Sequence, residues 1–144
     1  MTNETDTCRV VAYVFMLRAD TVLLLKRAHT GFQDGKYGPP GGHLEAHESV
    51  VQAAVRECRE EIGVEILPQD LQVVGVCHYD TPEGRGVDFF LTTTEWTGGP
   101  YARSECDSIV WCSPDDLPEG TIPFIRRAIE RHLLAGVWYD EIGW

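Results

Sequence analysis

The chain begins with a polar stretch and continues with two apolar runs of the kind that form buried strands. Residues 9–17 are rich in β-branched and aromatic side chains, and residues 21–27 are again largely apolar after a break at Ala19-Asp20. Two such runs separated by a turn dipeptide are typical of a hairpin of buried strands. We therefore expect a hairpin over residues 9–27, preceded by a flexible N-terminus at residues 1–8.

Two other segments carry apolar side chains at helical spacing. In residues 49–62 the positions i, i+3, i+4, i+7 and i+11 are Val51, Ala54, Val55, Cys58 and Ile62. This spacing places them on one face of a helix, and Gly63 follows where a helix stop is expected. The same period predicts a second helix from Ile122, Ile125, Ile129 and Leu133.

Three further runs have the composition of strands, with turn signals between them: residues 71–78, 87–94 and 109–112. Glycine- and proline-rich residues 29–42, and residues 114–123, predict loops. The order of strands, helix, strands and helix indicates an α/β or α+β fold around a mixed sheet. Since no repeat, linker or low-complexity tract interrupts this order, we expect a single domain over residues 9–144.

The charge of the chain narrows the classes of partner. Its 144 residues hold 12 lysines and arginines against 23 aspartates and glutamates, which gives a net charge of −11. This acidity argues against a module that binds a nucleic-acid duplex, because such a module needs a basic surface. A small nucleotide remains compatible, because Mg²⁺ can neutralise carboxylates and phosphates together.

The sequence also indicates the cellular compartment in which the protein is expected. Its longest unbroken apolar run, residues 10–17, is shorter than the roughly 20 residues that cross a membrane. The polar first seven residues do not resemble a signal peptide. The five cysteines include no CxxC pair, which favours reduced thiols over a disulfide framework. We expect a cytoplasmic protein with no membrane partner.

The candidate chemistry lies on the first predicted helix. Glu57, Glu60 and Glu61 fall at i, i+3 and i+4, so their carboxylates share a face away from the apolar stripe. Like charges at this spacing destabilise a helix unless a cation lies among them. Carboxylate oxygens suit Mg²⁺, and Mn²⁺ is a second candidate. A solvated acidic face paired with arginine is the alternative interpretation.

The segment that leads into this helix favours a ligand site. It reads Pro39-Pro40-Gly41-Gly42, a rigid stretch followed by two glycines. Because glycine has no side chain, backbone carbonyls and amides at Gly41 and Gly42 can come close to a ligand.

Residues 42–64 carry the order and spacing of a known motif. The Nudix box is written G-x5-E-x7-R-E-U-x-E-E-x-G-U, where U is a bulky aliphatic residue. Its positions here hold Gly42, Glu48, Arg56, Glu57, Cys58, Glu60, Glu61, Gly63 and Val64. Cys58 in the first aliphatic position is the single departure, and it concerns packing because cysteine behaves as a small buried hydrophobe. The chain therefore resembles the MutT-like Nudix hydrolases.

This resemblance implies an αβα sandwich, with a mixed sheet between helices, that hydrolyses a nucleoside diphosphate linked to another group. It assigns Mg²⁺ to Glu57 and Glu61, with Glu60 in the same set and the carbonyl of Gly41 as a backbone ligand. Arg56 is implied to hold Glu48 or a neighbouring carboxylate in place. One glutamate acts as general base, and the sequence leaves open which one.

Outside the box the resemblance implies substrate contacts. Arg27 matches a strand-end residue that meets phosphate, although solvation of the strand end is an alternative. Phe32 and Tyr37 match aromatic residues that flank a base, and packing is the alternative for both. Gly38 stands where enzymes that act on oxidised purines carry an asparagine, which argues against that selectivity.

Two further positions complete the candidate site. The backbone of Gly42 is expected to approach the substrate. Glu105 is a candidate additional carboxylate, unless Ala102 occupies that position of the pattern. The aromatic residues 138–144 are expected to fold back onto the domain or onto a partner subunit.

The function expected from these features is Mg²⁺-dependent hydrolysis of (deoxy)nucleoside triphosphates to monophosphate and pyrophosphate. Alternative substrates are ADP-ribose, a nucleotide sugar, a dinucleoside polyphosphate or a capped RNA end. A binding module that keeps the fold without catalysis is a third interpretation, disfavoured by the intact set of charged residues. The expected oligomeric state is a monomer or a homodimer.

Overall fold

The computed structural model describes residues 7–28, 31, 33–103 and 106–144. The elements follow one another as β1 (Arg9–Arg18), β2 (Thr21–Arg27), β3 (Tyr37–Gly38), β4 (Gly41–His43), α1 (Val50–Ile62), η1 (Pro68–Asp70), β5 (Gln72–Thr81), β6 (Gly84–Thr93), β7 (Cys106–Cys112), α2 (Pro123–Ala128), η2 (Ile129–Leu134) and β8 (Tyr139–Ile142).

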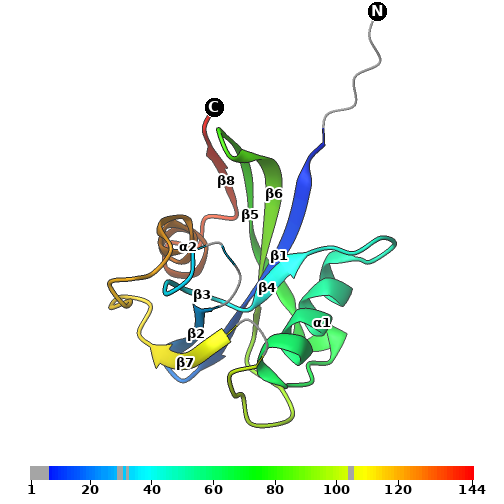
Figure 1. Ribbon diagram of the computed structural model, residues 1–144, viewed down its shortest axis with the longest axis vertical. Helices are drawn as coiled ribbons and strands as arrows, with labels where there is room; N and C mark the ends of the chain where they lie inside the picture. Colours follow the sequence, from blue (N-terminus) through cyan, green and yellow to red (C-terminus); the bar gives the residue numbers. More distant parts are fainter. Residues whose placement is uncertain (1–6, 29–30, 32, 104–105) are drawn as a thin grey trace, which may run out of the picture.

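The strands form a mixed sheet that lies between the two helices (Figure 1). The main strand order is β3-β2-β1-β6-β5-β8, with β4 added to β1 and β7 added to β2. Pairing is parallel between β1 and β6 and between β5 and β8, and it is antiparallel elsewhere. The α/β sandwich with a mixed sheet is thus confirmed.

Each face of the sheet carries its own hydrophobic core. Alternate residues of β1 point to opposite faces, so Ala12 and Val14 pack against α1 while Phe15 packs towards α2. Both cores draw on β2, which forms the predicted hairpin with β1 in the register Leu17 opposite Val22.

Helix α1 ends where the sequence predicts. Ser49 is the N-cap and exchanges hydrogen bonds with Gln52 in a capping box. Gly63 ends the helix in the left-handed conformation, at φ 71°, that glycine adopts without strain. The buried face includes Ala53, which the predicted stripe omits, while Val55 is only half-buried.

Two predictions of local structure need correction. Residues 29–42 are not all loop, because β3 and β4 lie within them and pair with β2 and β1. The second helix begins at Pro123 and changes to π-helical hydrogen bonding at η2. For β3 and β4, backbone pairing with β2 and β1, which leaves little side-chain pattern, decides the structure. Residues 139–142 form β8, parallel to β5, which agrees with the expectation that the aromatic C-terminal residues fold back onto the domain.

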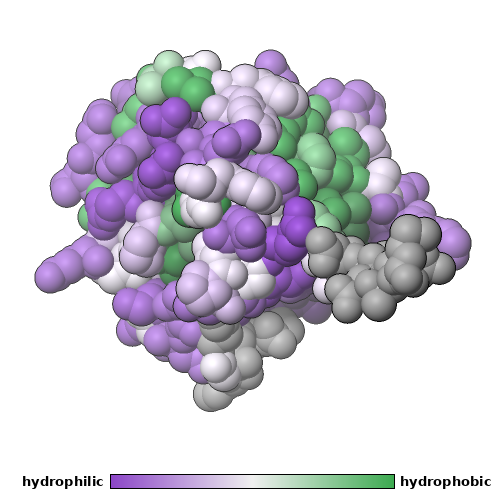
Figure 2. All heavy atoms as spheres, turned by 90° about the horizontal axis from the view of Figure 1, so that it is seen from above, coloured by the Kyte–Doolittle hydropathy of each residue, from purple (hydrophilic) through white to green (hydrophobic). Residues whose placement is uncertain are grey.

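One face of the molecule shows how polar and apolar residues are distributed on the surface. Seen from above relative to Figure 1, the described surface is mostly hydrophilic with smaller apolar areas (Figure 2). None of the helices that the structure describes is long and apolar enough to span a membrane.

Candidate active site

Two carboxylates of α1 reach the backbone of β4. The N–H of Gly41 donates a hydrogen bond of 3.0 Å to Oε2 of Glu61. At Gly42, a β-carbon would lie 2.5 Å from Oε1 of Glu57, and at Gly41 it would lie 2.3 Å from the carbonyl oxygen of Ala12. The absence of a side chain at Gly41 thus lets β4 lie directly against β1, and its absence at Gly42 leaves room for the carboxylate of Glu57.

Glu57 and Glu61 lie close enough for each carboxyl group to affect the pKa of the other. Burial, followed by the charge of Glu57, raises the pKa of Glu61 to about 8. Burial also raises the pKa of Glu57, against the opposing effect of Arg56. Two adjacent buried carboxyl groups with raised pKa values form a site that a divalent cation can neutralise.

Arg56 connects the acidic residues around this pair. Its guanidinium donates to both oxygens of Glu48, from Nε at 2.7 Å and from Nη2 at 2.9 Å. It also donates from Nη1 to Glu57 at 2.9 Å and to Glu60 at 3.2 Å. The contact with Arg56 is the main reason why the pKa of Glu48 falls to about 2. Arg56 therefore fixes the carboxylates relative to one another.

The third glutamate of the predicted set occupies a different environment. The side chain of Glu60 is 55% exposed, against 13% for Glu57, so it lies at the outer edge of the cluster. Within the residues that the structure describes, no three acidic, histidine or cysteine side chains converge as a complete set of metal ligands. The inner pair, Glu57 and Glu61, is thus the part of the predicted set that the fold brings together most closely.

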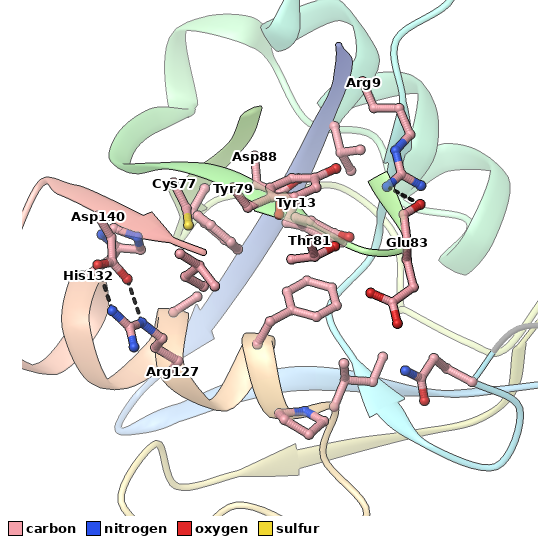
Figure 3. A pocket seen from close by; sticks show the side chains of 18 of the residues that line it. Arg9, Tyr13, Cys77, Tyr79, Thr81, Glu83, Asp88, Arg127, His132 and Asp140 are labelled. Carbon is pink, nitrogen blue, oxygen red and sulfur yellow. Dashed lines mark hydrogen bonds and ion pairs between the residues drawn. The ribbon is translucent and has the colours of Figure 1, made fainter. Parts of the chain in front are cut away.

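A pocket of about 480 Å³ opens on the α2 face of the sheet (Figure 3). Its walls come from β1, β5 and β6, from α2 and from β8, and they include the rings of Tyr13, Phe90 and Phe124. At one end Arg127 donates to both oxygens of Asp140, at 2.7 and 2.9 Å. At the other end Arg9 donates to the carbonyl of Glu83 at 3.2 Å.

Tyr13 places this pocket next to the carboxylate pair. A β-carbon on Gly41 would lie 2.7 Å from Cδ1 of Tyr13, so the tyrosine ring packs directly on β4. Burial raises the pKa of the Tyr13 phenol, and the charges of Asp88 and Glu61 raise it further. A ligand in the pocket can therefore reach the edge of β4 where Glu57 and Glu61 lie.

The other predicted site residues differ in how close they lie to the carboxylates and to the pocket. The charge of Arg27 lowers the pKa of Glu61, which places this cation near the carboxylates. Tyr37 packs against the core on the α2 side and does not line the pocket. Phe32 and Glu105 lie outside the described residues.

Sequence reasoning missed the pocket residues Tyr13, Asp88 and Phe124. A usable signal existed for Asp88, since it is an acidic residue within the apolar run Val87–Leu91. None existed for Tyr13 and Phe124, because aromatic residues in a strand or an amphipathic helix are ordinarily core.

Comparisons with known proteins agree with this geometry. Residues 7–133 match the family model described as NUDIX domain. Over 123 residues, 84% of this chain, the sequence is 35% identical to the NAD-capped RNA hydrolase NudC of Pseudomonas aeruginosa, and it spans 41% of that protein's length. It is 30% identical over 110 residues to the 8-oxo-dGTP diphosphatase of Escherichia coli, covering 74% of this chain and 84% of that protein.

Among solved structures, the fold resembles a MutT NUDIX hydrolase from Burkholderia pseudomallei, with a TM-score of 0.78 and 25% sequence identity. The match covers 87% of this chain and 98% of the other.

Proposed function

Since the chain belongs to the NUDIX domain family, we propose that it is a divalent-metal-dependent pyrophosphohydrolase that cleaves nucleoside triphosphates to monophosphate and pyrophosphate. The observation that carries this proposal is the packing of Tyr13 on Gly41. It joins a pocket large enough for a nucleoside to a pair of buried carboxylates suited to a cation.

The donor chemistry of the chain fits the metal that the family uses. Glu57 and Glu61 would hold Mg²⁺, with Glu60 and the carbonyl of Gly41 as further ligands. When bound, the ion supplies charge stabilisation to the pyrophosphate and lowers the pKa of an attacking water. Mn²⁺ has the same preference for oxygen ligands and is a second candidate.

The side chains of the protein supply positioning and proton transfer. Arg56 fixes Glu48, Glu57 and Glu60 through hydrogen bonds of 2.7 to 3.2 Å, so that the acidic groups keep their places as charge develops on the substrate. Arg27, close enough to affect the pKa of Glu61, binds phosphate oxygens. One glutamate of the cluster accepts the proton of the attacking water.

The pocket has room for a nucleoside. Its volume of about 480 Å³ lies within the range of small-molecule sites, roughly 300 to 1,000 Å³. Tyr13 and Phe124, with ring centroids 6.0 Å apart, provide surfaces on which a base stacks. The net charge of −11 disfavours long RNA as a substrate, because the acidic surface repels it. Other nucleoside diphosphate derivatives remain the alternative substrates.

A panel of nucleotides tests this proposal. Ribo- and deoxyribonucleoside triphosphates, ADP-ribose, a nucleotide sugar, diadenosine polyphosphate and an NAD-capped oligonucleotide are incubated with Mg²⁺, or with a chelator, and the products are separated by chromatography. Mg²⁺-dependent release of pyrophosphate from a triphosphate is the expected result. Turnover confined to the other nucleotides would assign the protein to a different substrate class. No turnover of any nucleotide in the panel would contradict the proposal.

A further inference from the structure

One acidic side chain lies inside the pocket and takes no part in the chemistry described above. We propose that Asp88 selects the base of the substrate by accepting a hydrogen bond from an exocyclic amino group. This inference rests on the proposed function, because it concerns which nucleoside triphosphates are cleaved.

Asp88 is buried in the middle of the sheet. It is 5% exposed and lies on β6, opposite Val11 of β1 and Cys77 of β5 in the strand registers. Phe90, two residues further along β6, points to the same face, where it stacks on Tyr13 with ring centroids 5.4 Å apart. The carboxyl group therefore lies in the wall of the pocket, among mostly apolar neighbours (Figure 3).

This carboxyl group receives no hydrogen bond from the described residues, and its electrostatic partner among them is Arg9. The guanidinium of Arg9 is directed elsewhere, since it donates to the carbonyl of Glu83 and lies over the ring of Tyr79, 5.8 Å from its centroid. A buried carboxyl group without a donor is costly, unless a bound molecule supplies the donor. The carboxyl group of Asp88 is therefore available to accept a hydrogen bond from a bound ligand.

The position of the pocket indicates which part of a nucleotide meets Asp88. The phosphates must lie at the carboxylate cluster beside β4, because Glu57 and Glu61 are there. The part of the substrate that passes Tyr13 into the pocket is then the base, which stacks on the aromatic walls. Guanine, adenine and cytosine each carry an exocyclic amino group that can donate to Asp88, whereas uracil and hypoxanthine do not.

Matched nucleotide pairs measure this selection. GTP and ITP differ by the 2-amino group, ATP and ITP by the group at position 6, and CTP and UTP by the group at position 4. We expect kcat/KM of the wild-type protein to favour the amino-bearing member of at least one pair by about tenfold, the discrimination that a hydrogen bond of about 1.4 kcal/mol provides. The pair that shows the preference identifies the base.

Variants of Asp88 assign the preference to this residue. Asp88→Ala removes the acceptor and should bring the ratio close to one, mainly by raising KM for the amino-bearing nucleotide. Asp88→Asn keeps the size and one acceptor oxygen and should retain part of the preference. Asp20→Asn, an exposed aspartate in the turn between β1 and β2, is the matched control and should retain all of it.

Binding of the corresponding monophosphates by calorimetry, in the presence of chelator, gives a second measurement that does not depend on turnover. Thermal melting of each variant shows whether it is folded. An Asp88→Ala protein that keeps the wild-type ratio, or a wild-type protein that cleaves triphosphates without favouring an amino group in any pair, would overturn the inference alone. A wild-type protein that cleaves no triphosphate would overturn the proposed function as well.

Discussion

A β-carbon at Gly42 would lie 2.5 Å from Oε1 of Glu57, so the position of this carboxylate depends on the absence of a side chain on the neighbouring strand. Glu57 is the residue that meets both Arg56 and Glu61. The geometry of the acidic cluster is therefore set by the backbone of β4 as much as by the helix that carries the glutamates.

Replacement of Gly42 tests this dependence. In Gly42→Ala the new methyl group must displace the carboxylate of Glu57, and a displacement of about 1 Å in an active site can lower the rate by about 100-fold. We expect kcat on a nucleoside triphosphate to fall by at least about tenfold while the protein remains folded. Steady-state kinetics compare kcat of Gly42→Ala with that of the wild type, and thermal melting shows whether the variant is folded.

Gly99→Ala is the control for that experiment, since a β-carbon at Gly99 meets no atom within 4 Å. It should leave kcat unchanged. Equal activity in the two alanine variants would show that the contact between Gly42 and Glu57 does not position the carboxylate.

Arg56 should not be replaceable by lysine. A lysine ammonium cannot make the two parallel hydrogen bonds to Glu48 and also reach Glu57 and Glu60, because it lacks the planar guanidinium. Groups that orient metal ligands typically contribute about 10- to 100-fold to metal affinity, and we expect a loss of that size for Arg56→Lys. Titration of activity with Mg²⁺ measures the change.

The matched control is Arg59→Lys, which alters an exposed pair with Glu65, 52% and 56% exposed, on the same helix. Its Mg²⁺ dependence should equal that of the wild type. If both lysine variants have wild-type Mg²⁺ affinity, Arg56 does not orient the ligands.

The burial of Asp88 should also make the stability of the protein depend on pH. Burial raises its pKa in the folded state from 3.8 to about 7, so between these values the folded protein binds the proton that the unfolded chain releases. The free energy of unfolding therefore decreases as pH rises from about 4 to about 7, by at most about 4 kcal/mol, and Asp88 adds no further loss above that range. Asp88→Asn should lack this part of the decrease.

Urea unfolding of the metal-free wild type and Asp88→Asn at pH 5 and pH 8 measures the difference. Other groups with shifted pKa values, Glu61 among them, are common to both proteins, so the difference between their slopes isolates Asp88. Parallel slopes would mean that Asp88 finds a partner in solution.

The elements that could be predicted from the sequence are those specified by local signals. The helix α1 has its capping box at Ser49, its stop at Gly63 and its apolar stripe within one segment. The strands β4 and β8 could not be found in this way, because three and four residues carry too little pattern and their structure depends on pairing with β1 and β5.

The residues of the candidate site also divide into those that local sequence signals specify and those that depend on contacts between distant segments. The spacing of Glu57 and Glu61 on one helix brought them together in the prediction and in the structure. The relation of Asp88 to Tyr13 depends instead on the parallel register of β1 with β6, which joins segments about 75 residues apart, and no local pattern contains it. The exposure of Glu60 likewise follows from how α1 packs on β4, which helical spacing alone does not specify.

The joint role of Glu57 and Glu61 in holding a divalent cation is tested most directly by the kcat of Glu61→Gln at saturating Mg²⁺. Removal of a buried carboxylate ligand should lower kcat by roughly 100-fold or more, while melting in chelator shows an intact fold, since the change removes no core contact. Glu65→Gln, at an exposed glutamate, should retain wild-type kcat. A kcat for Glu61→Gln within about threefold of the wild type would contradict the assignment of the metal site to this pair.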